Sequence, residues 1–527
     1  MNEPINLDVA RERAQRGKLD KATRRSPQPG SELDQKLAFL PQTDLGNAER
    51  FVARNRDRFL WCSTVGWMAW DGKRWDADGA AEKVLRAEHD TVRAIQVEAD
   101  AIRDTDLDVE LVPKKDGKGE MLSDKLASWG RSSEAASKLS AIAKHATAYL
   151  TVKPSDFDAD PMRINVLNGT LTIAKHPIEP YVTLMPHNPE DRITKIAPVT
   201  YDPNAACPTF DGFLLRVQPD INNRRFLDQW SGLSLTGDIS EQKLVFHWGT
   251  GRNGKSVYVD AVGYVAGDYG ATIPIETFIE SGRARRGGEA TPDLARLPGI
   301  RMLRTSEPEK GAKLAEALIK LATGGEPMDA RHLNKAFFTF KPSFKLTIQG
   351  NYRPKVDGTD EGIWGRLNLV PWSVFIPKEE RDRKLGEKLK AEASGILNRL
   401  LSGLCDWLDN GLVIPPDVEA ATETYRADSD PIGRFLAVCT KPTIGHRTQA
   451  TVLHELYVAW AKVNGEASRS ANMLGRELRG RGMPDIKSGV QWWVDIETTK
   501  LPSEFVDNYG EPLHADENAY RRYRDGD

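Results

Sequence analysis

Apolar residues recur along this chain with two periods, and the change from one period to the other marks the elements that we predict. Short, mainly apolar segments, typical of buried strands, occur at 244–246, 300–303 and 344–348. Apolar residues at helical spacing occupy the longer stretches 82–103 and 132–150. Buried strands that alternate with helices are typical of α/β folds. The pattern therefore predicts a mixed α/β protein.

The stretches before the central strands have weaker patterns. Residues 48–75 begin with helical spacing and continue as two aromatic runs separated by the hairpin signal Asp71-Gly72. Residues 163–202 alternate as strands do, and helical spacing leads from there to Leu235. Four tryptophans lie in the first of these segments: Trp61, Trp67, Trp70 and Trp75. Tryptophans can stack on nucleic-acid bases, but such a cluster is more often the core of a small sheet.

The strand at 244–246 runs directly into a glycine-rich loop with the spacing Gly-x-x-x-x-Gly-Lys-Ser. Glycines allow backbone conformations in which successive N–H groups point at phosphates, and the helix that follows the loop adds the positive end of its dipole. Lys255 is expected to neutralise the β and γ phosphates from an exposed loop, and the Ser256 hydroxyl to hold Mg²⁺. The expected nucleotide-binding residues are Gly249, Gly251, Asn253, Gly254, Lys255 and Ser256.

Polar residues follow the two later strands. Glu307 and Glu309 come after the strand at 300–303, where a carboxylate can order a Mg²⁺ shell and polarise a water, although a helix cap would explain them equally simply. Asn351 follows the strand at 344–348, where an amide can orient the attacking water. Arg366 precedes a further apolar strand and is a candidate arginine finger for a neighbouring subunit's γ-phosphate. We expect Asn351 and Arg366 at one edge of the sheet.

Composition narrows the class of protein. Net charge is −3 over 527 residues, which argues against a uniformly basic nucleic-acid wrapper but permits a local basic stripe. The four cysteines form no C-x-x-C pair, so neither a zinc site nor a disulfide framework is predicted. The chain contains no apolar run of membrane-spanning length and begins with a polar segment, so we expect a cytoplasmic protein, in the host cell if a phage encodes it.

These motifs occur in a fixed order within a short region: GTGRNGKS, SEPE, TGGEPMDARHLNK, QGN and GIWGRL. This order resembles the superfamily-three helicases, in particular the primase–helicases of phages, plasmids and large DNA viruses. The similarity extends from about residue 50 to 500 through NVLNGTL and YDPNAACPTF. The resemblance implies an AAA+-like ATPase that forms a hexameric ring and pulls single-stranded DNA through a channel lined by hairpin tips.

The resemblance also implies a role for each motif residue. Glu307 would be the acidic catalytic residue and a Mg²⁺ ligand, Asn351 the sensor, and Arg366 the finger acting in trans. The segment MDARHLNKAFFTF is expected to form a hairpin, with the DNA-contacting residues Arg331, His332 and Lys335 near its tip. Two features depart from the family pattern. The acidic motif is Glu-Pro-Glu rather than adjacent carboxylates, which leaves Glu309 as an alternative to Glu307, and the finger rests on one arginine rather than two.

The C-terminal region suggests a small DNA-binding domain. Helices at 435–439 and 451–463 precede a basic helix capped by Ser468, and a strand containing Gln491-Trp492-Trp493-Val494 follows. This order suggests a winged helix that contacts DNA through Arg469, Arg476 and Arg479, although winged helices also serve as protein-contact domains.

The sequence thus divides into seven predicted parts. They are a flexible lead-in (1–45), an α+β domain (46–200), a helical collar (201–240), the ATPase domain (241–375), a helical lid or linker (376–428), the winged-helix-like domain (429–500) and an acidic tail (501–527).

The leading functional prediction is an ATP- and Mg²⁺-dependent replicative DNA helicase of a mobile element, working as a homo-oligomer on single-stranded and forked DNA. Two alternatives stay open: a complete primase–helicase, and a DNA-binding ATPase switch of the origin-binding or packaging type. Primer synthesis needs paired carboxylates that hold two metal ions. The nearest candidate, Asp104 with Asp106 and Asp108, is more simply a solvated turn. We therefore expect that the polymerising primase domain is absent and that a separate primase or polymerase supplies primers.

Overall fold

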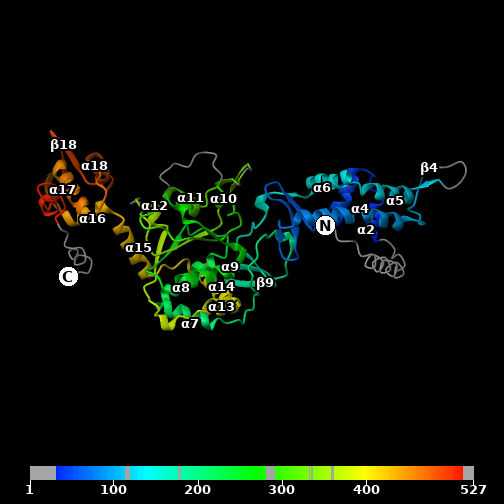
Figure 1. The fold of residues 1–527 in the computed structure, drawn as a ribbon, viewed down its shortest axis with the longest axis horizontal. Helices are drawn as coiled ribbons and strands as arrows, with labels where there is room; N and C mark the ends of the chain where they lie inside the picture. The colour runs from blue at the N-terminus through cyan, green and yellow to red at the C-terminus, as the bar shows by residue number, and fades with distance from the viewer. Residues whose placement is uncertain are drawn as a thin grey trace, which may run out of the picture. The chain divides into compact units, whose positions relative to one another are not determined.

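The computed structural model describes residues 31–112, 119–175, 180–280, 291–331, 333, 336–357 and 361–513 (Figure 1). The chain divides into two compact units, one of residues 1–172 and 183–197 and the other of residues 173–182 and 198–527. Both units mix helices and strands, so the predicted α/β class is confirmed at this level.

The first unit is a helical layer on a small sheet. Its helices are α2 (Glu32–Leu37), α3 (Asp44–Asn55), α4 (Ala80–Ile102), α5 (Leu122–Ser133) and α6 (Ala136–Leu150). The sheet has the order β3-β2-β1-β6, from β1 (Phe59–Cys62), β2 (Gly66–Trp70), β3 (Trp75–Asp76) and β6 (Thr151–Val152). A separate short hairpin joins β4 (Glu110–Val112) to β5 (Glu120–Met121). Helix α4 packs against both α5 and α6 (Figure 1).

Two sequence expectations about this unit are refined by the structure. Residues 31–45 belong to the folded unit, because Ser31 and Asp34 form a capping box that starts α2. The predicted flexible lead-in is therefore folded at its carboxyl end, while residues 1–30 lie outside the described residues. The tryptophan cluster is largely internal: Trp75 is 2% exposed, and the rings of Trp61 and Trp67 meet edge to face at 5.3 Å.

The acidic segment after α4 is a turn, as predicted. Asp104 has a positive φ of 58°, which short polar side chains tolerate in turns. Asp108 accepts hydrogen bonds from the backbone N–H and the hydroxyl of Ser123, at 2.9 and 2.7 Å, at the start of α5. Its carboxylate therefore caps a helix.

Glu88 on α4 is a buried carboxyl that makes folding of this unit depend on pH. Its side chain is 3% exposed and accepts one hydrogen bond, from the Ala143 N–H at 3.2 Å. Burial raises the pKa of Glu88 from 4.5 to about 7, although the Ala143 N–H opposes the shift. Between these pH values the folded state holds a proton that the unfolded state has released, so stability falls as the pH rises.

We expect Glu88→Gln to stabilise the protein at pH 8 by about 2–3 kcal/mol more than at pH 5, because glutamine has no charge to bury and keeps the acceptor oxygen. Urea unfolding of both proteins at the two pH values measures this difference. An equal effect of the substitution at pH 5 and pH 8 would contradict the raised pKa.

A three-stranded sheet of order β7-β8-β9 lies where the chain passes between the units. Its strands are β7 (Arg163–Val166), β8 (Gly169–Lys175) and β9 (Pro180–Met185).

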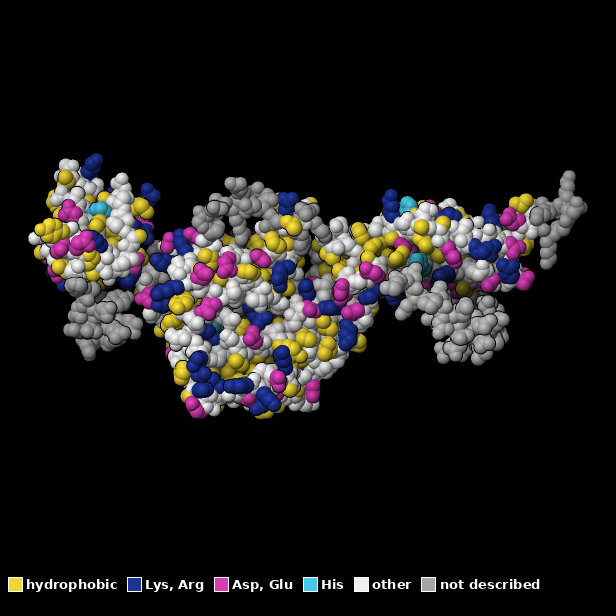
Figure 2. Space-filling view, viewed as in Figure 1, with side chains coloured by type: hydrophobic (Ala, Val, Ile, Leu, Met, Phe, Trp, Pro, Cys, Tyr) yellow, Lys and Arg dark blue, Asp and Glu magenta, His cyan; other side chains and the backbone are white. Residues whose placement is uncertain are grey.

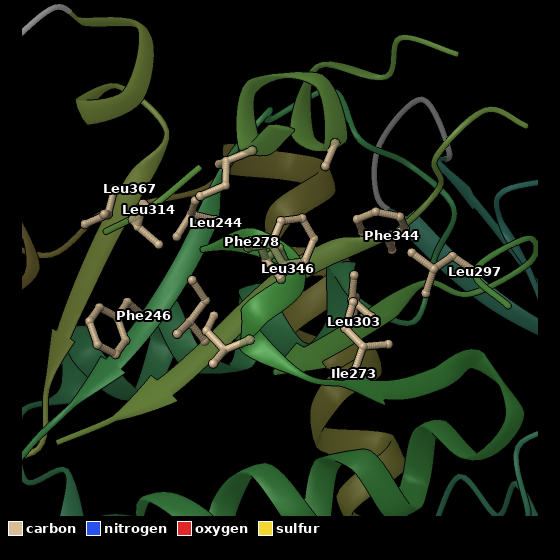
Figure 3. Close-up of a cluster of buried hydrophobic side chains, with 14 of the residues drawn as sticks. Leu244, Phe246, Ile273, Phe278, Leu297, Leu303, Leu314, Phe344, Leu346 and Leu367 are labelled. Atoms are coloured by element: carbon tan, nitrogen blue, oxygen red, sulfur yellow. The ribbon is translucent and has the colours of Figure 1, made fainter. Parts of the chain in front are cut away.

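The second unit is built on a five-stranded parallel sheet of order β11-β12-β15-β10-β16. The strands are β10 (Leu244–Trp248), β11 (Gly270–Ile273), β12 (Met302–Thr305), β15 (Lys345–Gly350) and β16 (Leu367–Pro371). One face buries the cluster of Figure 3, where Leu244, Leu346 and Phe278 converge. The opposite face is covered too, because Trp230 on helix α8 (Ile221–Leu233) donates from its indole to Thr347 on β15 at 3.0 Å. Burial on both faces explains the continuous apolar run at 244–246 in β10.

Helices surround this sheet. They are α7 (Pro208–Val217), α8 (Ile221–Leu233), α9 (Lys255–Ala266), α10 (Pro292–Ala295), α11 (Glu316–Gly324), α12 (Glu361–Trp364), α13 (Leu385–Ala391), α14 (Ala393–Asn410) and α15 (Pro416–Asp428). Helices α8 and α14 approach closely at glycines: a Cβ on Gly232 would lie 2.2 Å from the Leu400 carbonyl oxygen. Figure 2 shows Lys and Arg side chains gathered near α7 and α13, so this unit has a local basic surface despite the negative net charge.

An antiparallel hairpin projects between α11 and β15, as the sequence predicts. Strand β13 (Met328–Arg331) pairs with β14 (Phe337–Phe340), and the register sets Arg331 opposite Phe337.

The C-terminal part of the second unit has its own core and a three-stranded sheet of order β17-β19-β18. Its elements are α16 (Pro431–Cys439), β17 (Thr440–Gln449), α17 (Ala450–Val463), α18 (Ala471–Gly480), β18 (Asp485–Ser488) and β19 (Val490–Thr498). The predicted cap was wrong by two residues: Ser470, rather than Ser468, caps α18 through the Met473 N–H. The sequence also missed β17, where exposed polar residues and the bulge between Pro442 and Arg447 hide the strand alternation.

Candidate nucleotide site

Three parallel strands of the second unit end at one edge of the sheet and bring separate motifs together. Strand β15 pairs with β10 on one side and with β12 on the other. The glycine-rich loop follows β10, Glu307 follows β12, and Asn351 follows β15. Because the strands are parallel, these three segments meet at their carboxyl ends, where α/β sheets place ligands.

The glycine-rich loop has the backbone that its sequence requires. Gly251 and Gly254 have φ values of 94° and 84°, and Arg252 between them is also left-handed, at 55°. Gly249 has no room for a side chain, because a Cβ there would lie 2.2 Å from Nδ2 of Asn253. The same Nδ2 donates to the Trp372 carbonyl at 2.9 Å and ties the loop to the segment after β16. The loop therefore has a fixed curved path before α9 begins.

Lys255 is the first residue of α9 and is buried, with 6% of its surface exposed. Its ammonium donates to the carbonyl oxygens of Gly249 and Gly350, at 2.7 and 3.0 Å, and to Oδ1 of Asn351 at 3.0 Å. Burial lowers the pKa of Lys255, and the nearby charge of Glu307 opposes that shift. The expectation of an exposed lysine was wrong, because the side chain runs between the ends of β10 and β15 rather than into solvent.

Glu307 and Asn351 contact each other directly. The Asn351 backbone N–H donates to Oε1 of Glu307 at 2.5 Å, while the Asn351 side chain accepts from Lys255. Glu307 and Glu309 flank Pro308, which is buried against Gly350: a Cβ on that glycine would lie 2.8 Å from Pro308 Cδ. Only Glu307 lines the cavity at this edge; Glu309 does not.

The cavity has a volume of about 280 Å³. It is lined by Gly251, Arg252, Asn253, Gly254, Lys255, Ser256, Val257, Glu307, Gln349, Gly350 and Asn351. Ser256 is exposed at its wall, on the first turn of α9. The site thus combines a glycine loop, a helix N-terminus, one lysine and one carboxylate, which is the chemistry that binds a phosphate chain together with a hard cation.

Sequence reasoning missed several residues at this site. Gln349 lines the cavity, and the described residues offer its buried Oε1 no hydrogen-bond partner. His247, which pairs with Gln349 in the register of β10 and β15, is buried behind the loop, and its Nδ1 accepts from the Trp372 indole at 3.1 Å. Burial, with Lys255 nearby, lowers the pKa of His247 to about 3. The sequence did contain a signal for Gln349: it lies two positions before Asn351, and residues two apart on a strand point to the same side.

Arg366 lies at the other edge of the sheet, contrary to the expectation that it shares an edge with Asn351. It immediately precedes β16, whose first residue pairs with Leu244 at the start of β10. Its Nε donates to Thr323 Oγ1 on α11 at 3.1 Å, and Nη1 donates to the Gly362 carbonyl on α12. Arg366 is therefore five residues of strand away from the end of β16 that adjoins the glycine loop.

None of the proposed DNA-contacting residues that the structure describes lines the cavity. Arg331 ends β13, whereas His332 and Lys335 lie outside the described residues. In the C-terminal part, Arg469 pairs with Glu477, and Arg479 pairs with Asp485 at 2.8 Å. Arg476 is exposed on α18 between them.

The described residues contain no cluster of three or more His, Cys, Asp or Glu side chains arranged to hold a metal ion, and all four cysteines are free. No described helix combines the length and apolarity needed to cross a bilayer.

Parts of this chain are similar to proteins of large DNA viruses. Residues 48–219 match the family described as D5 N terminal like. Over 243 residues the chain is 30% identical to a "Putative helicase" of Acanthamoeba polyphaga mimivirus, a match that covers 43% of this chain and 25% of that protein. It is 24% identical over 355 residues to a "Putative primase" of African swine fever virus, which covers 61% of this chain and 35% of that protein.

A "Putative helicase" of Frog virus 3 is 28% identical over 242 residues, covering 42% of this chain and 25% of the relative. The chain therefore spans only about a quarter to a third of these relatives. Among solved structures, the apo C-terminal region of NrS-1 (305–718) aligns with 57% of this chain and 78% of its own, with 13% identity and a TM-score of 0.38.

Proposed function

We propose that this chain, a member of the primase–helicase family of large DNA viruses, is an ATP-driven DNA helicase that translocates on single-stranded DNA. The observation that carries the proposal is the convergence of the glycine loop, Lys255, Glu307 and Asn351 on one cavity. Its core would be an AAA+-like phosphate-loop ATPase. Several copies of the chain would form a ring that unwinds DNA during replication of a phage, plasmid or other mobile element.

The residues of the cavity fit ATP with Mg²⁺. The Lys255 ammonium donates its three N–H groups to three protein oxygens. When a nucleotide binds, phosphate oxygens can take the place of these acceptors. Ser256 and Glu307 provide two hard oxygen ligands. This suits Mg²⁺, which keeps several waters and takes one or two protein ligands beside the phosphates. When bound, the cation would screen charge on the phosphates.

Each residue then has a distinct part in hydrolysis. Lys255 stabilises negative charge on the transferring phosphate. Glu307 accepts a hydrogen bond from the attacking water and orients it. Asn351 connects Lys255 with Glu307, because its side-chain oxygen accepts from the Lys255 ammonium while its backbone N–H donates to the Glu307 carboxylate. Gln349, with its buried Oε1, is suited to accept a hydrogen bond from a water in the cavity.

The helicase activity is tested by strand displacement on a forked duplex with ATP and Mg²⁺, together with electron microscopy of the protein with a nonhydrolysable ATP analogue. We expect ATP-dependent displacement and rings with DNA in the channel. DNA binding and ATP hydrolysis without displacement would favour a DNA-binding switch, and primer synthesis by the chain alone would favour a complete primase–helicase.

The C-terminal part is proposed to be a winged helix that binds forked DNA. Its elements follow the order helix, strand, helix, helix, strand, strand, and the last two strands form a hairpin beside β17. Helix α18 would be the helix that meets DNA. Arg476 and Arg479 are both exposed on this helix, but Arg479 pairs with Asp485, and Arg469, just before the helix, pairs with Glu477.

We expect Arg476→Ala to weaken binding of a forked duplex. The slope of log affinity against log salt concentration should become shallower by about 1, the change for one lost phosphate contact. Arg479→Ala is the matched control with a smaller effect, because Asp485 already neutralises that arginine. The measurement is the affinity across a salt titration. Identical slopes for the wild type and both variants would assign this domain to a protein partner.

A further inference from the structure

The hairpin of β13 and β14 exposes an aromatic side chain. Phe338 and Phe340 pack against the main cluster of the second unit, whereas Phe337 points to the other face and is 53% exposed. Leu333, in the turn, is 73% exposed. Side chains alternate along a strand, so the position of Phe337 on the outer face follows from the burial of its neighbour. The Phe337 side chain is thus not part of the core that Phe338 and Phe340 join.

A cation lies over this exposed ring. The guanidinium carbon of Arg331 is 5.1 Å from the centroid of the Phe337 ring, within the range of a cation–π contact. Arg331 is also fixed through its backbone: its N–H donates to Thr291 Oγ1 and its carbonyl accepts from the Thr291 N–H, both at 3.0 Å. The ring and the charge are therefore held together at the end of a braced strand.

An aromatic face beside a positive charge is the arrangement that binds single-stranded nucleic acid without regard to sequence, since every base has a face for stacking and every nucleotide a phosphate. Asp329, an acidic residue two pairs away along the ladder and therefore on the same face, accepts a hydrogen bond from the Thr339 hydroxyl at 2.5 Å. In the sequence, His332 and Lys335 lie between Arg331 and Phe337, so the segment that joins the two strands is rich in basic residues.

We propose that Phe337 is a stacking platform for one unpaired base of single-stranded DNA, with Arg331 beside the adjoining phosphate. The inference rests on the proposed function, in which this hairpin contacts DNA. It adds an apolar contact to the electrostatic contacts already expected there, and it explains why the hairpin exposes an aromatic residue.

The test measures the affinity of the full chain for an oligothymidylate, with a saturating nonhydrolysable ATP analogue, for the wild type and for Phe337→Ala. We expect the substitution to weaken binding by about five- to a hundredfold, the range for one stacked base, without changing the slope of affinity against salt. Phe337→Tyr should retain affinity. With an oligomer whose bases are removed, wild type and Phe337→Ala should bind equally, since no base is left to stack.

Phe375 provides a matched control. It is 60% exposed and has the guanidinium of Arg381 5.9 Å from its ring centroid, so it repeats the local chemistry on a different element. Phe375→Ala should leave oligothymidylate affinity unchanged. An equal loss in both phenylalanine variants would overturn the assignment to the hairpin.

The remaining outcomes separate this inference from the proposed function. If Arg331→Ala and Lys335→Ala weaken binding while Phe337→Ala does not, the platform is rejected and the hairpin keeps its DNA role. If none of the three weakens binding, the DNA role of the hairpin fails as well. If Phe337→Ala weakens binding of the base-free oligomer by the same factor, or changes the oligomeric state measured by light scattering, the Phe337 side chain is a structural or subunit contact and not a stacking platform.

Discussion

Lys255→Ala is expected to lower the rate of ATP hydrolysis by at least about 10²-fold, the loss typical when one preorganised electrostatic donor is removed. The structure gives the reason: the ammonium is held between Gly249, Gly350 and Asn351, at the junction of the three motifs that form the cavity. Release of phosphate from ATP under saturating Mg²⁺ measures the effect.

Because Lys255 is buried, its truncation also leaves three oxygens without their donor, so loss of fold must be separated from loss of chemistry. Lys255→Met keeps most of the side-chain volume and should be as inactive as the alanine variant. Lys378→Ala removes an exposed lysine from the same unit and should hydrolyse ATP as the wild type does. Wild-type turnover by a folded Lys255→Met protein would reject the site.

Arg366→Ala is expected to reduce ATP hydrolysis by about 10³- to 10⁵-fold if the arginine acts as a finger on the adjacent subunit. Its position at the edge of the sheet remote from its own glycine loop accords with action on another subunit's nucleotide. The contacts to Thr323 and Gly362 use Nε and Nη1, and the fork of the guanidinium presents a further nitrogen at Nη2.

Mixing two inactive variants distinguishes a shared site from a structural arginine. A ring that contains Arg366→Ala and Lys255→Ala subunits has some interfaces where an intact loop meets an intact finger, so part of the activity should return. Co-assembly must be established first, for example by pull-down of differently tagged subunits. No recovery in a verified mixed ring would place Arg366 within its own subunit, where it bridges α11 and α12.

Local sequence patterns determined several features directly. The apolar run at 244–246 lies in β10, because a strand buried on both faces needs near-continuous apolar residues. The mainly apolar segment 344–348 overlaps β15 from Lys345 onward. The glycine-rich loop follows from residue type alone, since φ near +90° at Gly251 and Gly254 is costly for other residues. The hairpin of residues 328–340 was also predicted correctly. All of these depend on neighbours within a few residues.

The tertiary structure decided which side chains meet. Nothing in the spacing of Glu307 and Glu309 selects between them; the choice follows from Pro308 packing on Gly350, a contact between segments some forty residues apart in sequence. The burial of Lys255 and the cavity-lining position of Gln349 follow from the pairing of β10 with β15. The separation of Arg366 from Asn351 follows from the direction of β16, whose amino end, rather than its carboxyl end, carries the arginine. Periodicity specifies which faces of an element are buried but not which element covers them, so strand order and direction were fixed only by long-range packing.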